Sequence, residues 1–214
     1  MIIIKIIVLF LFLIFVEKYP KLNNFSDETK FNFYRSLMCL FFTLYSFDNS
    51  INNLITGYME PFDFKFKGFN DISEWFVSYL ILDIGKMIWM KNKRWDLYIH
   101  HVWCLFSFMI AMYYNKIGFF HSFLLINEGI SIVSGIDSMY LEEKELEKSR
   151  KCKVFRKNII KYLRLPVWII ILLISLHKSH NVPTIMFWNG ILTSCLMIWL
   201  DRYWEQKCDK VIGL

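Results

Sequence analysis

This sequence has little charge, little proline and glycine, and no ordered cysteine pattern. Charged residues make up 21% of its 214 positions, glycine occurs 8 times, proline 4 times, and the 5 cysteines are scattered. The composition excludes an intrinsically disordered chain and a collagen-like repeat. Scattered cysteines without a CxxC pair exclude a secreted scaffold held together by disulfides.

Apolar side chains, in contrast, are abundant. Hydrophobic residues make up 56% of the chain, aromatic residues 19%, and the mean hydropathy is +0.36. A soluble core of this size cannot hide so many apolar side chains without leaving large exposed patches. The composition therefore indicates a membrane protein, and the length allows one domain.

Seven apolar segments, each about 15–20 residues long, fall in the length range that crosses a bilayer as a helix. They are Ile2–Val16, Phe33–Phe47, Ile72–Met90, Leu97–Tyr114, Ile117–Ile136, Ile160–Leu176 and Thr184–Leu200. The predicted fold is an all-α, polytopic transmembrane helix bundle of about seven spans. The first segment could instead be a signal peptide, but no small-residue cleavage site follows it, so we keep it as an uncleaved span.

The basic residues predict an orientation for this bundle. With seven spans, 17 of the 25 lysines and arginines fall in segments on one side of the membrane and 4 on the other. The positive-inside rule then predicts that the N-terminus lies outside or in the lumen and the C-terminus in the cytosol. We expect the membrane to be the endoplasmic reticulum or the plasma membrane, and the sequence does not distinguish them. The net charge of +6 is explained by topology, so we expect no nucleic-acid partner. Residues 1–29 are the anchor span and its loop, 30–205 the multi-pass domain and 206–214 a short cytosolic tail.

Ionisable side chains inside a membrane are costly, and here they gather at one depth. Asp83, His100 and Glu128 lie on three consecutive predicted spans, about 10, 5 and 12 Å inside their cytosolic ends at 1.5 Å per residue. His100 shares its helical face with small and polar residues, whereas the adjacent His101 points about 100° away. We therefore predict a polar intramembrane site of Asp83, His100 and Glu128, with His101 as the alternative to His100. The accompanying lipid-binding or cavity-lining candidates are Tyr79, Cys104, Ser107, His121, Ser131 and Asp137.

Simpler explanations exist for each of these residues. Asp83 could pair with Lys86 at i,i+3, the two histidines could lie at the membrane interface, and Glu128 could hold helices together by hydrogen bonds. A metal is not predicted from the histidines, because adjacent histidines on a helix cannot easily bind one ion. His177 and His180 have i,i+3 spacing but fall on the other side of the membrane.

Three motifs in this order resemble the TLC-domain family, the translocon-associated, longevity-assurance and ceroid-lipofuscinosis membrane proteins. They are the S-Y-L-I-L-D run at Ser78–Asp83, the His100-His101 pair at the head of the next span and Glu128 in the span after it. Phe33–Ser36, read as F-Y-R-S, is similar to the arginine–serine segment of the family's first core helix. The resemblance covers roughly residues 30–205.

The resemblance implies a role in membrane-lipid metabolism, with two forms. Ceramide synthases of this family carry an H-D-x-x-D run after the histidine pair, and the corresponding residues here, Asn127–Asp137, lack the H-D. The chain is closer to the small TLC-domain-only branch, which implies lipid homeostasis by binding or sensing membrane lipids. The alternative is a ceramide-synthase-like N-acyltransferase with acyl-CoA as co-substrate and a site of His100, His101, Asp83 and Glu128. No other cofactor is expected, and whether the protein is an enzyme stays open.

The largest predicted loop, Tyr140–Lys161, begins acidic and ends polybasic. Residues 148–157 carry six lysines and arginines, which next to a span can bind anionic headgroups at about 1 kcal/mol per basic residue. The alternative is that these charges only enforce the topology.

Overall fold

The structure is a computed structural model that describes residues 1–65, 67–178 and 182–213, with the side chains of 48–56 and 58 outside the description. Its described part is helical and contains no strand. The helices are α1 (Ile2–Glu17), α2 (Asp27–Met59), α3 (Phe69–Trp89), α4 (Trp95–Tyr114), α5 (Gly118–Asn127), α6 (Ile130–Glu142), α7 (Leu146–Ile159), α8 (Leu165–His177) and α9 (Thr184–Ile212), with a 3-10 turn at Pro20–Leu22 and a π-helical turn at Ile160–Arg164.

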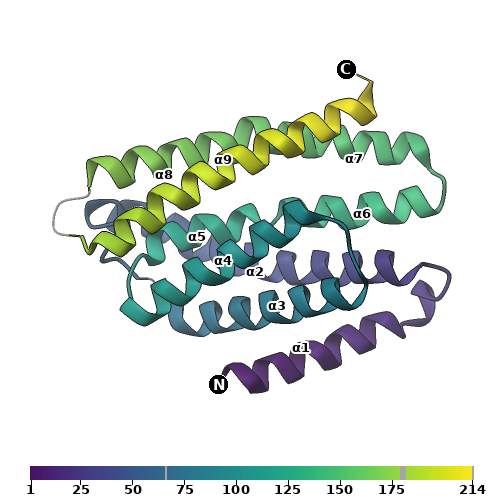
Figure 1. The fold of residues 1–214 in the computed structure, drawn as a ribbon, viewed down its shortest axis with the longest axis horizontal. Helices are drawn as coiled ribbons and strands as arrows, with labels where there is room; N and C mark the ends of the chain where they lie inside the picture. The colour runs from purple at the N-terminus through teal and green to yellow at the C-terminus, as the bar shows by residue number, and fades with distance from the viewer. Residues whose placement is uncertain (66, 179–181, 214) are drawn as a thin grey trace.

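These helices run side by side as an elongated bundle (Figure 1). The helix pair α5 and α6 forms one rod, and α7 continues through the π turn into α8. In the bundle α1 packs on α3, α2 packs on α5 and α6, α4 packs on α3 and α9, and α7 and α8 pack on α9. The predicted all-α helix bundle is therefore confirmed.

Four of the rods are long and apolar enough to cross a membrane: Trp95–Tyr114, Gly118–Glu142, Leu146–His177 and Thr184–Ile212. Their outer faces carry large apolar side chains, such as Val102 (54% exposed) and Leu173 (59% exposed). Lipid acyl chains solvate such a surface, whereas water would not. The chain is thus a membrane protein with four candidate spans; α1, at 16 residues, is shorter than these four, and the count of seven stays a prediction.

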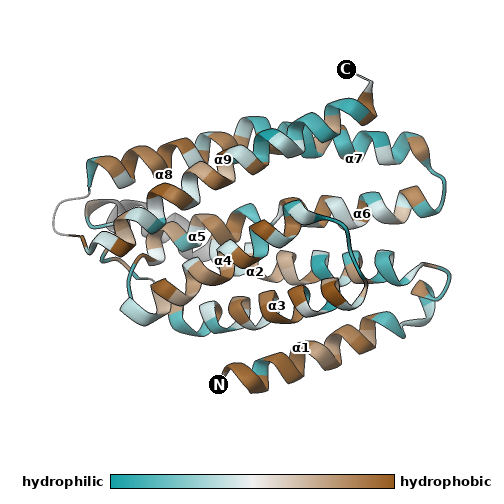
Figure 2. Cartoon of the chain, in the orientation of Figure 1, coloured by the Kyte–Doolittle hydropathy of each residue, from teal (hydrophilic) through white to brown (hydrophobic). Residues whose placement is uncertain are grey.

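The two ends of the bundle differ in polarity. The connections between α1 and α2, α3 and α4, and α6 and α7 lie at the same end as the C-terminus, to the right in Figure 1. Figure 2 shows hydrophilic residues concentrated at this end of α7 and α9, while α1 and α8 are mostly hydrophobic. These are the segments that the positive-inside rule predicts to be cytosolic. The structure groups them at one end, and which compartment that end faces stays a prediction.

The prediction of a loop at Tyr140–Lys161 is wrong, because most of this segment is helical. α6 runs to Glu142, a short turn follows, and α7 begins at Leu146. The polybasic stretch is a helix because its charges find internal partners: Lys153 lies 2.6 Å from Asp137, and Lys157 lies 2.5 Å from Asp209. Pairs between residues three or four positions apart on the helix add a few tenths of a kcal/mol each.

Candidate functional site

A polar cavity of about 470 Å³ lies between α2, α4, α6, α7 and α9. Its inner wall includes His100, His101 and Glu128, and it extends to Glu28 and Glu142, which are exposed at the end that carries the α6–α7 turn. At this end Ser26 joins α2 to α6: its backbone N–H and hydroxyl donate to the Glu142 carboxylate at 2.5 and 2.8 Å. The cavity thus connects buried ionisable groups to one end of the bundle.

Asp83 sits at the centre of a buried charge network that joins three helices. Arg35 on α2 donates to it through Nε and Nη2, at 2.6 and 2.8 Å, and His101 Nδ1 on α4 lies 2.8 Å from its second oxygen. Asp83 has no exposed surface, so a carboxylate there depends on these cations. The two-pronged arginine contact fixes its orientation. Asp83 therefore stands behind the cavity wall and positions His101, which lines it.

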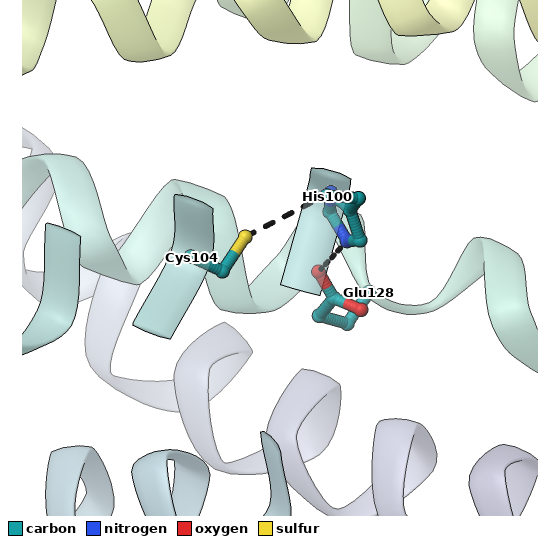
Figure 3. A group of neighbouring side chains, drawn as sticks. All are labelled: His100, Cys104 and Glu128. Carbon is teal, nitrogen blue, oxygen red and sulfur yellow. Dashed lines mark hydrogen bonds and ion pairs between the residues drawn. The ribbon is translucent and has the colours of Figure 1, made fainter. Parts of the chain in front are cut away.

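His100 belongs to a second group of side chains, drawn in Figure 3. Its Nε2 lies 3.3 Å from Glu128 Oε1, and its Nδ1 lies 3.8 Å from the sulfur of Cys104 one turn along α4. The ring also packs edge-on against Trp204 of α9, with centroids 5.6 Å apart. Both nitrogens of His100 are thus engaged by neighbouring side chains.

A break between α5 and α6 sets the position of Glu128. Around it the backbone N–H groups of Glu128 and Ser131 donate to carbonyls three residues earlier, at 3.2 and 2.9 Å, instead of four. Arg164 stabilises this break by donating to the Asn127 carbonyl at 2.7 Å. Such carbonyls at a helix end have no intrahelical partner and need another donor. Tighter winding also changes the angular phase of the residues that follow.

Further ion pairs fix the ends of the surrounding helices. Arg164 Nε lies 3.0 Å from Asp201 of α9, and both side chains are almost fully buried. Asp96, at the start of α4, pairs with Arg94 at 2.6 Å and accepts the Trp204 indole N–H at 2.7 Å. These contacts hold α4, the π turn and α9 together around the cavity. Buried ion pairs therefore link the helices that form the cavity walls.

His100, Cys104 and Glu128 could together hold a metal ion. One ligand atom from each lies within 4.8 Å of the others, and His100 and Cys104 have the i,i+4 spacing that places two ligands on one helix face. A nitrogen, a thiolate sulfur and a carboxylate oxygen would suit zinc best. The His100–Glu128 pair already satisfies both groups without an ion, so the geometry permits a metal but does not require one.

Most of the predicted site residues lie around this cavity. Those that line it are His100, His101, Glu128, Tyr79, Ser131 and Asp137. Asp83 lies behind the wall, and Cys104 is buried beside His100. Ser107 and His121 lie deeper: they contact each other at 3.3 Å and line a separate space of about 20 Å³, the size of one water molecule.

Two orientations differ from the helical-wheel prediction. His101 is as buried as His100, at 5% exposure, because α4 packs against α3 on one side and α9 on another, so two of its faces point into the bundle. In one continuous helix Asp137 would face about half a turn away from Glu128, yet it lines the cavity as a candidate should, because the tight turn at Glu128 changes the phase of α6. Asp83 does not pair with Lys86, which binds Glu17 of α1 at 2.6 Å instead.

Sequence reasoning missed the arginines of the site. Arg35 enters only through the family resemblance, and Arg164 lies near the start of the predicted span Ile160–Leu176 without an assigned role. A usable signal existed, since an arginine and an aspartate inside or beside apolar spans need partners. Arg35 with Asp83 and Arg164 with Asp201 are such partners, but one sequence does not say which acid each arginine meets.

No family model, no curated protein and no solved structure matches this chain. The TLC-domain resemblance therefore stays a hypothesis that rests on the motifs at Ser78–Asp83, His100-His101 and Glu128. What the protein does has to be argued from the cavity.

Proposed function

We propose that this protein acts in membrane-lipid homeostasis by binding the headgroup of a membrane lipid in the polar cavity. The observation that carries the proposal is a 470 Å³ space, lined by charged and hydroxyl side chains, inside a bundle whose outer faces are apolar. Polar side chains inside a membrane protein cost free energy, so a polar cavity of this size indicates a site for a polar ligand.

The cavity wall carries charged and hydroxyl groups that could bind such a ligand. Asp83 and Glu128 each have a cationic or imidazole partner, so their charges persist when the cavity is closed to water. Ser131, Ser134 and Ser138 of α6 add hydroxyls along one side of the cavity. A lipid headgroup in this space would exchange its water contacts for these donors and acceptors, which reduces the free-energy cost of burying it.

The cavity also suits entry from the membrane surface. Its exposed end lies beside the α6–α7 turn, at the more hydrophilic end of the bundle (Figure 2). With the orientation that the positive-inside rule predicts, this end faces the cytosolic leaflet. A lipid could then place its headgroup in the cavity while its acyl chains stay among the apolar outer faces.

A second function, acyl transfer, is favoured by the geometry of His101. Its Nδ1 lies 2.8 Å from Asp83, while its Nε2 has no partner within the part of the chain that the structure describes. A histidine with a carboxylate close to one nitrogen and no partner at the other is similar to the arrangement of a general base, although the Nδ1–Asp83 contact is an ion pair without hydrogen-bond geometry. The TLC-domain resemblance implies the same chemistry, with acyl-CoA as donor.

In this reaction His101 Nε2 would take the proton from a lipid amine or hydroxyl as that group attacks the thioester carbonyl. The carbon–sulfur bond then breaks, the acyl group stays on the lipid and the thiol leaves with the proton. Asp83 stabilises the imidazolium, and Arg35 keeps Asp83 in place. His101 would be the base in this geometry, because both nitrogens of His100 are already engaged.

Lipid mass spectrometry of the purified protein tests the proposal. The wild type should co-purify with a defined lipid class, and His100→Ala/His101→Ala should lose it, whereas the control His177→Ala, at an exposed position outside the cavity, should keep it. An unchanged lipid profile in the double variant would refute lipid binding at this site. For the second function, purified protein given acyl-CoA and a lipid amine should form product, and His101→Gln should abolish product while lipid still binds.

A further inference from the structure

Four arginines line the cavity, and three of them are neutralised. Arg35 pairs with Asp83, Arg94 with Asp96, and Arg164 with Asp201. The fourth, Arg156 on α7, has no ion pair and no hydrogen bond to any side chain or carbonyl in residues 1–65, 67–178 and 182–213. Its Nε is buried and has no partner.

Arg156 stands out among the basic residues of its own helix. The other five in residues 148–157 all contact an internal acceptor. Asp137, the nearest cavity acid on α6, is already bound by Lys153 at 2.6 Å and by the Ser149 hydroxyl at 2.5 Å. A partly buried guanidinium without an ion pair or hydrogen bond is costly, and Asp137, which attracts it electrostatically, is already held by other groups.

Two more guanidinium groups border the same space. Arg94 and Arg164 both line the cavity and repel Arg156 electrostatically. Arg94 binds Asp96 through Nε and Nη2, and Arg164 uses Nε and Nη1, which leaves Nη1 of Arg94 and Nη2 of Arg164 without a partner among the described residues. The cavity thus holds an excess of donors and positive charge on its α7 side.

We propose that Arg156, together with Arg94 and Arg164, binds the phosphate of the ligand that enters the cavity. Guanidinium groups match phosphate in charge and in the geometry of paired hydrogen bonds, and they bind it more specifically than lysine does. The phosphate would neutralise Arg156 and relieve the repulsion among the three arginines. The inference rests on the proposed lipid binding and narrows it to phosphate-bearing ligands. Two sources share this chemistry: an anionic phospholipid headgroup and a soluble phosphate-bearing molecule such as coenzyme A.

Ligand-dependent thermal stability of the full chain in detergent tests the proposal. Short-chain phosphatidic acid should raise the unfolding temperature and bind about tenfold more tightly than the matching diacylglycerol, which has no phosphate. Arg156→Gln should remove this preference, and Arg156→Lys should keep part of it. The control Arg150→Gln alters an exposed arginine of the same helix and should bind like the wild type.

The outcomes separate the inference from the proposed function. If Arg156→Gln binds phosphatidic acid as tightly as the wild type, the phosphate site is wrong. If the wild type binds both lipids equally, the result supports lipid binding in the cavity and refutes the phosphate site. If it binds neither lipid nor coenzyme A, the result refutes both lipid binding and the phosphate site. Displacement of phosphatidic acid by coenzyme A, absent in Arg156→Gln, would support the site and assign the phosphate to a soluble source. Arg156 has no partner to lose, so folded Arg156→Gln is expected, and the unliganded unfolding temperature checks it.

Discussion

Replacing Asp83 by asparagine should destabilise the protein strongly. The substitution keeps the shape of the side chain but removes the negative charge that Arg35 and His101 share at 2.6 and 2.8 Å. It leaves the Arg35 guanidinium, only 7% exposed, without a counter-charge. Breaking one partner out of a buried ion pair costs about 3–5 kcal/mol. For a chain of this size that corresponds to a fall in unfolding temperature of about 6–20 °C.

A double variant separates the ion pair from simple loss of packing. In Arg35→Met/Asp83→Leu both charges are replaced by apolar groups of similar size, which often is close to neutral for a buried pair. We expect the double variant to recover at least half of the loss in stability of Asp83→Asn. Glu147→Gln serves as the control, because Glu147 and its partner Lys151 are largely exposed and their i,i+4 pair should contribute only a few tenths of a kcal/mol.

Thermal unfolding followed by intrinsic tryptophan fluorescence in detergent provides the assay. The expected order of unfolding temperature is wild type and Glu147→Gln highest, the double variant next and Asp83→Asn lowest. If Asp83→Asn unfolded within about 2 °C of the wild type, or if the double variant unfolded at no higher temperature than Asp83→Asn, Asp83 and Arg35 would not form a coupled buried pair.

Three further outcomes test the packing and the topology. Gly135→Val should lower the unfolding temperature, because a Cβ there would lie 2.8 Å from the Asn32 carbonyl and overpacking costs about 1–3 kcal/mol of stability. The control Gly85→Ala should leave the unfolding temperature unchanged, because its Cβ would meet nothing within 4 Å. Arg164→Met should cost about 3–5 kcal/mol by leaving buried Asp201 unpaired, measured in the same assay, and a loss below 1 kcal/mol would contradict the pair. Protease added to the cytosolic side should remove a C-terminal tag; protection of the tag would reverse the predicted orientation.

The helical bundle could be predicted from the sequence because long apolar segments mark the positions of its helices. All seven apolar segments coincide with helical rods in the described structure, although their ends shift by several residues. The loop at Tyr140–Lys161 was predicted wrongly because charge was taken as a sign of irregular structure. In α7 the same charges are neutralised by neighbours such as Asp137 and Asp209, which lie far along the chain or on another helix.

The sequence indicates which residues belong to the site better than it indicates which of them contact one another. The structure places His100 and Glu128 on the cavity wall and Asp83 behind it, where Asp83 contacts His101. Helical wheels could not say that His101, and not His100, meets Asp83, because they ignore which helices surround α4. Nor could they include the tight turn at Glu128, which a hydrogen bond from Arg164 to the Asn127 carbonyl stabilises from across the bundle.

Photo-crosslinking with a lipid that carries a diazirine beside its headgroup tests the central claim, that the cavity binds a lipid headgroup. We predict that peptide mass spectrometry will find the label on cavity-lining segments of α2, α4, α6 and α7, and that excess unlabelled lipid will suppress it. Label found only on exposed apolar residues of the outer faces, such as Leu173, and insensitive to competition would contradict the account.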